Sequence, residues 1–153
     1  MSEQNSGGRI VVGVDASDSS MEALRWAVRQ ADLTGASVEA TIAWHYPLLL
    51  GGYAWPPFGM LEDCDFPAQA GKLLAESVAR AAGDGDHARI AEVVREGDPA
   101  QVLIDQADGA DLLVVGSRGH GGFAEALLGS VSQHCVHHAR CPVVILRDGK
   151  PAS

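Results

Sequence analysis

The stretch Asp111-Leu-Leu-Val-Val-Gly-Ser-Arg-Gly119 decides the fold prediction, because it joins a run of aliphatic residues to a glycine-rich turn. A short, continuous aliphatic run is typical of a strand that is covered on both faces of a parallel sheet. Glycines after such a strand let the backbone turn tightly, and ligands of open α/β sheets bind at this end of the strands. The stretch therefore predicts a parallel α/β sheet with a functional edge.

Segments on both sides of this stretch repeat the alternation of strand and helix. The capping box Ser19-x-x-Glu22 predicts the start of one helix, and Gly35 is placed to end it in the left-handed conformation. Asp98 followed by Pro99 predicts the start of another helix. The alternation favours an α/β fold with right-handed crossovers. The other predicted strands are 9–15, 37–44, 89–95 and 142–147, and the other predicted helices are 68–82 and 130–139.

The chain has 153 residues, enough for one compact domain with its own core, and a net charge of −9. This charge argues against a nucleic-acid or anionic-membrane surface, which needs clustered Lys and Arg. The odd set Cys64, Cys135 and Cys141 suggests reduced thiols and a cytoplasmic protein, with Cys135 as a small core residue. We expect neither a signal peptide nor a membrane span, because no apolar run is suitable.

We expect a single domain over residues 9–147, between a disordered N-terminal tail at 1–8 and a C-terminal tail at 148–153. A long apolar loop, residues 45–66, follows the second predicted strand. Long loops in compact domains usually carry function, so one hypothesis is a lid over the ligand. The alternatives are packing across a neighbouring subunit and partial disorder.

Two predicted strand ends carry residues suited to an anionic ligand. Gly13-Val-Asp15 ends the first strand, and the glycine-rich segment Gly116 to Gly122 ends the fourth. Successive N–H groups in such a turn form an anion-binding nest, and the start of the helix after Gly129 adds N–H groups and a partial positive charge. Ser130 and Ser132 add hydroxyl donors suited to phosphate oxygens. Together these residues predict a phosphate site made mostly of backbone.

This phosphate site is not a P-loop, because G-x-x-x-x-G-K-[ST] is absent and neither lysine lies near it in the sequence. Charge compensation is therefore expected from N–H groups, from Arg118 or His120, and from Mg²⁺. Asp15 is placed to bond a ribose hydroxyl or to help hold the metal, although it also suits the N-cap of the first helix. The segment Gly119 to Ala124 matches the dinucleotide fingerprint G-x-G-x-x-A, but it lies late in the chain without the expected acidic partner, so we treat the match as chance.

The spacing Gly116-x₂-Gly119-x₉-Gly129-Ser130 resembles the G-x₂-G-x₉-G-[ST] motif of ATP-binding universal stress proteins. Four other segments are similar to that family in the same order, and the resemblance spans about residues 9–147. These segments are Ile10 to Ser17, Gly97 to Ala100, Ala110 to Ser117 and Cys141 to Arg147.

The resemblance implies a Rossmann-like, five-stranded parallel sheet in the order 3-2-1-4-5, with helices on both faces. It also implies a homodimer formed through the last strand, Pro142 to Arg147. The implied ligand is ATP, with Asp15 on the ribose, and Gly13 and the backbone of Ala43 near the adenine. The full set of expected nucleotide-binding residues is Gly13, Val14, Asp15, Ala43, Gly116, Arg118, Gly119, Gly129, Ser130, Val131 and Ser132.

A site of backbone donors supplies no evident general base, and no G-x-S-x-G elbow is present, so the sequence supports binding better than turnover. The expected function is a nucleotide-dependent stress-response or regulatory protein with an unknown protein partner. One alternative is a slow ATPase or another nucleotide-using enzyme. Others are a dimeric interaction module without nucleotide, and a site that prefers another adenine nucleotide such as cyclic AMP.

A histidine-rich stretch precedes the last predicted strand. His134, His137, His138 and Cys141 lie close together, and His134 shares a helix face with His138. Because Pro142 follows at once and no partner carboxylate is evident, we interpret the stretch as an exposed helix end, where histidines favour the helix dipole. We therefore expect no metal there.

Overall fold

The computed structural model describes residues 8–45, 65–83, 90–117 and 128–147. Five strands form one sheet in the order β3-β2-β1-β4-β5, and each neighbouring pair runs parallel. The predicted fold class and strand order are confirmed. The strands are β1 (Arg9–Gly13), β2 (Ser37–Trp44), β3 (Ile90–Glu96), β4 (Leu112–Gly116) and β5 (Val143–Leu146). The helices are α1 (Asp18–Thr34), α3 (Phe66–Ala82), α4 (Pro99–Gln106) and α5 (Ser130–His138).

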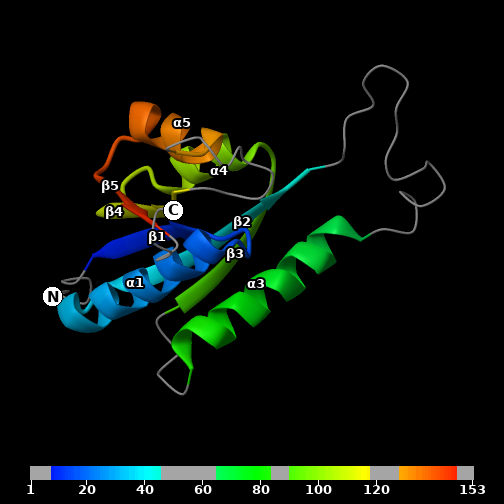
Figure 1. The fold of residues 1–153 in the computed structure, drawn as a ribbon, viewed down its shortest axis with the longest axis horizontal. Helices are drawn as coiled ribbons and strands as arrows, with labels where there is room; N and C mark the ends of the chain where they lie inside the picture. Colours follow the sequence, from blue (N-terminus) through cyan, green and yellow to red (C-terminus); the bar gives the residue numbers. More distant parts are fainter. Residues whose placement is uncertain (1–7, 46–64, 84–89, 118–127, 148–153) are drawn as a thin grey trace, which may run out of the picture.

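Helices cover both faces of the sheet (Figure 1). α1 and α3 pack on one face, and α4 and α5 pack on the other. Side chains alternate between the two faces along each strand, so one strand contributes residues to both cores. In β1, Val12 joins the core under α1 with Leu24, whereas Val11 joins the core under α4 with Leu103. β1 is therefore buried on both faces, as its aliphatic sequence predicts.

The strand order reverses between β1 and β4, which pair with each other at the centre of the sheet. The chain leaves β1 into α1 on one face, whereas the helix that follows β4 in the chain, α5, packs on the opposite face. The carboxyl ends of β1 and β4 therefore border the crevice in which open α/β sheets bind their ligands.

The start of α1 differs from the prediction. Ser17 is the N-cap, and its Oγ accepts a hydrogen bond from the Ser20 N–H at 3.2 Å. The capping box predicted from Ser19 is therefore wrong. Glu22 forms an ion pair with Arg25 at 2.8 Å, one turn further into the helix.

The predicted end of α1 and the predicted start of α4 are confirmed, whereas α3 begins at Phe66, two residues before the prediction. Gly35 ends α1 at a φ of 81°, the left-handed conformation, and its N–H donates to the Ala31 carbonyl at 2.8 Å. Asp98 caps α4 by accepting from the Gln101 N–H at 3.1 Å. Asp65 caps α3 in the same way, which the sequence analysis did not predict.

The predicted tails and most of the predicted loop, residues 1–7, 148–153 and 46–64, lie outside the described residues, and so does the lid hypothesis. Gly8, predicted as part of the tail, belongs instead to the fold, since its carbonyl accepts from the Ser37 N–H at 3.0 Å. Beside the loop, Trp44 and Phe66 stack with ring centroids 6.3 Å apart, which brings the end of β2 next to the start of α3. No helix in the described part of the chain is long and apolar enough to cross a membrane.

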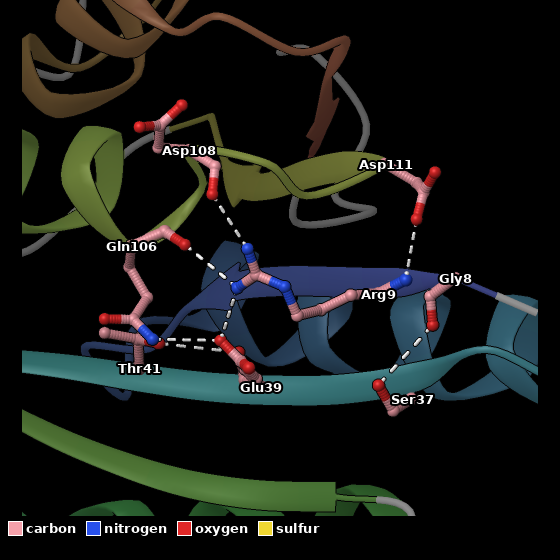
Figure 2. A network of polar contacts seen from close by, with 8 residues as sticks. All are labelled: Gly8, Arg9, Ser37, Glu39, Thr41, Gln106, Asp108 and Asp111. Carbon is pink, nitrogen blue, oxygen red and sulfur yellow. Dashed lines mark hydrogen bonds and ion pairs between the residues drawn. The ribbon is translucent and has the colours of Figure 1, made fainter. Parts of the chain in front are cut away.

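The Arg9 side chain joins three elements at the amino end of β1 (Figure 2). Its Nη1 donates to Glu39 Oε1 of β2 at 2.8 Å and to the Gln106 carbonyl at 3.0 Å. Its Nη2 donates to the Asp108 carbonyl at 2.9 Å, in the turn after α4. The Arg9 backbone N–H also donates to the Asp111 carboxylate at 2.7 Å. This network lies at the end of β1 opposite to the crevice.

Candidate functional site

The turn from β1 to α1 is held by local hydrogen bonds. β1 ends at Gly13, two residues before the predicted end, and the Val14 N–H donates to the Thr41 carbonyl of β2 at 2.9 Å. The Asp15 N–H donates to Ser20 Oγ at 3.2 Å, inside the first turn of α1. These bonds place Asp15 at the carboxyl end of β1, beside the start of α1.

Asp15 turns its carboxylate toward the start of α1. Its Oδ1 accepts from the Ser17 N–H at 2.9 Å, so the alternative that Asp15 is itself the N-cap is wrong. Its Oδ2 has no hydrogen-bond partner among the described residues. Ala16, between the two, has a φ of 66°, and this left-handed conformation costs a non-glycine residue about 1–2 kcal/mol. Such strain is typical of turns that are kept for function.

Two glycines of the predicted site lie close to neighbouring elements, and packing requires a glycine at one of them, Gly116. A Cβ on Gly116 would lie 2.7 Å from the Ser19 carbonyl carbon and from the Ser20 nitrogen, so only glycine lets β4 approach α1 this closely. A Cβ on Gly13 would lie 2.7 Å from Leu103 Cδ1 of α4, a side chain that can move. Both glycines were predicted to give a ligand access to the backbone, and in the structure their missing side chains also make room for protein.

The backbone of Ala43 points toward the β1 side of β2. The Thr41 carbonyl accepts from Val14 beside β1, and the Trp44 carbonyl accepts from the Gly97 N–H at 2.8 Å beside β3. Backbone groups alternate in direction along a strand, so the Ala43 N–H and C=O point the same way as those of Thr41. Because Thr41 is opposite Gly13, the last residue of β1, Ala43 lies beyond the paired part of that strand. This orientation is compatible with its predicted contact with a base.

The first turn of α5 carries no side-chain cap. Its N-cap is Gly129, and no side chain in the described part of the chain closes this end. The other helices that the structure describes are each capped by a Ser or Asp side chain. The N–H groups of Ser130, Val131 and Ser132 therefore stand at an open helix start, which attracts anions through hydrogen bonding and the helix dipole.

Hydrogen bonds to the Ser117 carbonyl connect the end of β4 to α5, and we call this arrangement the Ser117 clasp. The Gly129 N–H donates to the Ser117 carbonyl at 2.6 Å. Ser132 Oγ lies 3.2 Å from the same carbonyl and 3.0 Å from the Gly129 carbonyl, and Ser132 is 2% exposed. This hydroxyl is engaged in the fold, contrary to its predicted role as a phosphate donor, while the Ser132 N–H remains in the open first turn.

Cys135 supports α5 from inside the core, as predicted for a small buried residue. Burial, and to a smaller extent the Asp98 carboxylate and Cys141, together raise the pKa of the Cys135 thiol to about 11. Burial also raises the pKa of the Cys141 thiol, an effect that the Arg9 guanidinium opposes. Both thiols are therefore neutral at physiological pH.

The structure gathers most of the predicted site residues at the carboxyl ends of β1, β2 and β4 and at the start of α5. Arg118 and Gly119 lie outside the described residues, so their roles stay predictions. The sequence analysis missed Ala16 and Ser20, whose contributions depend on the conformation of the turn. The gathered residues are Gly13, Val14, Asp15, Ala43, Gly116, Gly129, Ser130, Val131 and Ser132.

Comparison with known proteins assigns this arrangement to a family. The model of the universal stress protein family matches residues 8–147. The chain belongs to the universal stress protein family. A universal stress protein of Mycobacterium tuberculosis is 34% identical over 142 residues, which cover 91% of this chain and 45% of that protein. The chain spans about half the length of the curated relatives it matches.

Solved structures of universal stress proteins share the fold. A universal stress protein crystallised in complex with cAMP is 30% identical, with a TM-score of 0.69, and the match covers 94% of this chain and 99% of that chain. UspA from Lactobacillus plantarum has a TM-score of 0.75 at 24% identity, covering 92% of this chain and 98% of that chain.

Proposed function

We propose that this universal stress protein binds an adenine nucleotide, ATP with Mg²⁺, in the crevice at the carboxyl ends of β1 and β4. The observation that carries the proposal is the uncapped first turn of α5, whose N–H groups need an acceptor. The 30% identical relative crystallised with cAMP supports an adenine base. The choice of ATP rests on the sequence spacing Gly116-x₂-Gly119-x₉-Gly129-Ser130.

The phosphates are assigned to the start of α5. The N–H groups of Ser130, Val131 and Ser132 would bind phosphate oxygens, and a hydrogen bond to a charged group contributes about 1.5–3 kcal/mol. Arg118 and Gly119, which precede this helix in the sequence, are assigned to the same phosphates. The site contains no P-loop lysine, so Mg²⁺ would supply part of the charge neutralisation when bound.

The nucleoside is assigned to the β1 and β2 side of the crevice. Oδ2 of Asp15, which has no partner among the described residues, suits a ribose hydroxyl or a magnesium ion. The backbone of Ala43, which lies beyond the paired part of β1, and the turn at Gly13 and Val14 would border the base. This assignment fits the structure, since all four residues lie at the same end of the sheet.

We also propose that the protein is a cytoplasmic homodimer that regulates a stress response according to its bound nucleotide. Support for the dimer comes from β5, which forms one edge of the sheet. All four of its residues are aliphatic and only half-buried, so a second copy of the strand would cover them. Sedimentation velocity tests this part, because a single monomeric species at micromolar concentration contradicts it.

The nucleotide proposal is tested by denaturing freshly purified protein and chromatographing the supernatant. We expect an adenine nucleotide in about stoichiometric amount. Calorimetric titrations with ATP, AMP and cAMP, each with and without Mg²⁺, would then rank the ligands. The absence of adenine from the supernatant, together with no heat of binding for any of the three, would reject the proposal. Tighter binding of cAMP than of ATP would reject only the choice of ATP.

A further inference from the structure

Two histidines meet on the solvent-facing side of α5. His134 and His138 are both exposed and lie four residues apart, so they project from the same face of the helix on successive turns. Their ring centroids are 4.7 Å apart, with the ring planes tilted by 40°. The pair belongs to the C-terminal part of α5, whereas the proposed nucleotide site uses its first turn.

The separation of the two rings fits chelation of one metal ion. Imidazole nitrogens bind Zn²⁺ at about 2.0–2.1 Å, which puts each ring centroid about 3.2 Å from the metal. Two ligands at 90–109° around one ion therefore have centroids about 4.5–5.2 Å apart. The observed 4.7 Å lies inside this range, so the two rings are close enough to share one ion.

The surroundings also favour a cation. His138 lines a polar pocket of about 220 Å³ between α4 and α5, together with Asp105, Asp108 and Arg140. The two carboxylates outnumber the arginine there, and the chain as a whole carries a net charge of −9. Neutral imidazole selects Zn²⁺, Cu²⁺ and Ni²⁺ over Mg²⁺ and Ca²⁺, which prefer oxygen ligands.

We propose that His134 and His138 form a surface site for a divalent transition-metal ion of the Zn²⁺, Cu²⁺ and Ni²⁺ class. This proposal reverses the expectation from sequence that the histidines are only an exposed helix end. No third His, Cys, Asp or Glu joins the pair to form a metal cluster among the described residues. Water therefore completes the coordination, and the ion exchanges readily, unlike a closed structural zinc.

Chelator-stripped protein titrated with NiCl₂ at pH 8 tests the site. We expect saturable binding of one ion per chain, and selective broadening of the His134 and His138 imidazole proton signals by the paramagnetic ion. His134→Ala should abolish this binding, since it removes one of the two ligands. His137→Ala is the matched control, because it changes a neighbouring histidine of α5 and leaves the pair intact.

The remaining histidine of α5, His137, does not form an equivalent pair with His138. His137 and His138 are adjacent in sequence, project in different directions from the helix, and have ring centroids 6.3 Å apart. The proposal is overturned if wild-type protein shows no saturable Ni²⁺ binding, or if His134→Ala binds Ni²⁺ like His137→Ala. It is also overturned if the ion broadens other histidines and not this pair. Far-UV circular dichroism of each variant confirms that α5 and the fold are intact.

Discussion

Replacing Gly129 by Asp tests the proposed phosphate contact without weakening the fold. Gly129 has a φ of −72° and a ψ of 168°, an extended conformation that any residue adopts. Asp is among the most favourable N-cap residues, and its carboxylate would accept from the open N–H groups of α5. Gly and Asp differ by only a few tenths of a kcal/mol at this position, so we expect the free energy of unfolding to change by less than about 0.5 kcal/mol.

The same carboxylate would compete with a bound phosphate. Removing one charged hydrogen bond costs about 1.5–3 kcal/mol of binding free energy. Two negative charges about 5 Å apart add about 3 kcal/mol of repulsion at an effective dielectric constant of 20. The two effects together amount to about 4.5–6 kcal/mol, so the affinity for ATP should fall by about a thousandfold to about ten-thousandfold in Gly129→Asp.

Isothermal titration calorimetry with ATP and Mg²⁺ measures this loss, and urea unfolding measures the stability. Gly129→Ala is the matched control, because a methyl group cannot cap the helix, and we expect its affinity to stay within about threefold of wild type. Unchanged ATP affinity in Gly129→Asp would show that the phosphates do not lie at α5. Equal losses in both variants would indicate a steric effect in place of competition for the N–H groups.

Three further outcomes test the structure. Gly116→Ala should lower the free energy of unfolding by about 3 kcal/mol, because the added Cβ meets the Ser19 backbone. Gly71→Ala should raise the free energy of unfolding by about 0.5–1 kcal/mol, because the added Cβ lies 3.9 Å from the nearest side-chain atom. Urea unfolding measures both changes. Arg9→Met removes three side-chain hydrogen bonds and should cost about 3 kcal/mol in the same assay, while ATP affinity stays unchanged. The pKa of the Cys135 thiol rises from 9.0 in the unfolded chain to about 11 in the folded protein. The contribution of this thiol to the free energy of unfolding is therefore complete below pH 9.0 and is lost as the pH rises to about 11. Chemical unfolding of wild type and Cys135→Ala at pH 8 and pH 11 should show this loss, up to about 2.7 kcal/mol, in wild type alone.

The sheet could be predicted from sequence because its signals are local. Aliphatic runs such as Leu112 to Val115 identify buried strands wherever they occur, and the order of the strands followed from the family resemblance. The start of α1 was mispredicted because Ser17, Ser19 and Ser20 are all competent caps by composition. The left-handed conformation of Ala16 decides between them, and sequence patterns rarely indicate such a conformation for alanine.

The candidate site could be located from sequence but not explained residue by residue. Gly116 was predicted as a ligand-binding glycine, yet the atoms that require a glycine at this position belong to Ser19 and Ser20, far away in the chain. Ser132 was included for its hydroxyl, and tertiary burial engages that hydroxyl with the Ser117 carbonyl instead. Sequence motifs indicate where a functional edge lies, while the use of each atom depends on packing between distant segments.

The Ser117 clasp has a consequence for the entropy of ligand binding. It holds residue 117 next to residue 129, the two ends of the stretch that separates them in the sequence. Joining the ends of a free chain of this length costs roughly 2 kcal/mol, and folding has already met this cost. A ligand that binds at the start of α5 therefore need not bring these two positions together. Doubling the number of residues between these two positions would add only about 0.6 kcal/mol, so the length of this stretch can change with little effect on the contact between β4 and α5.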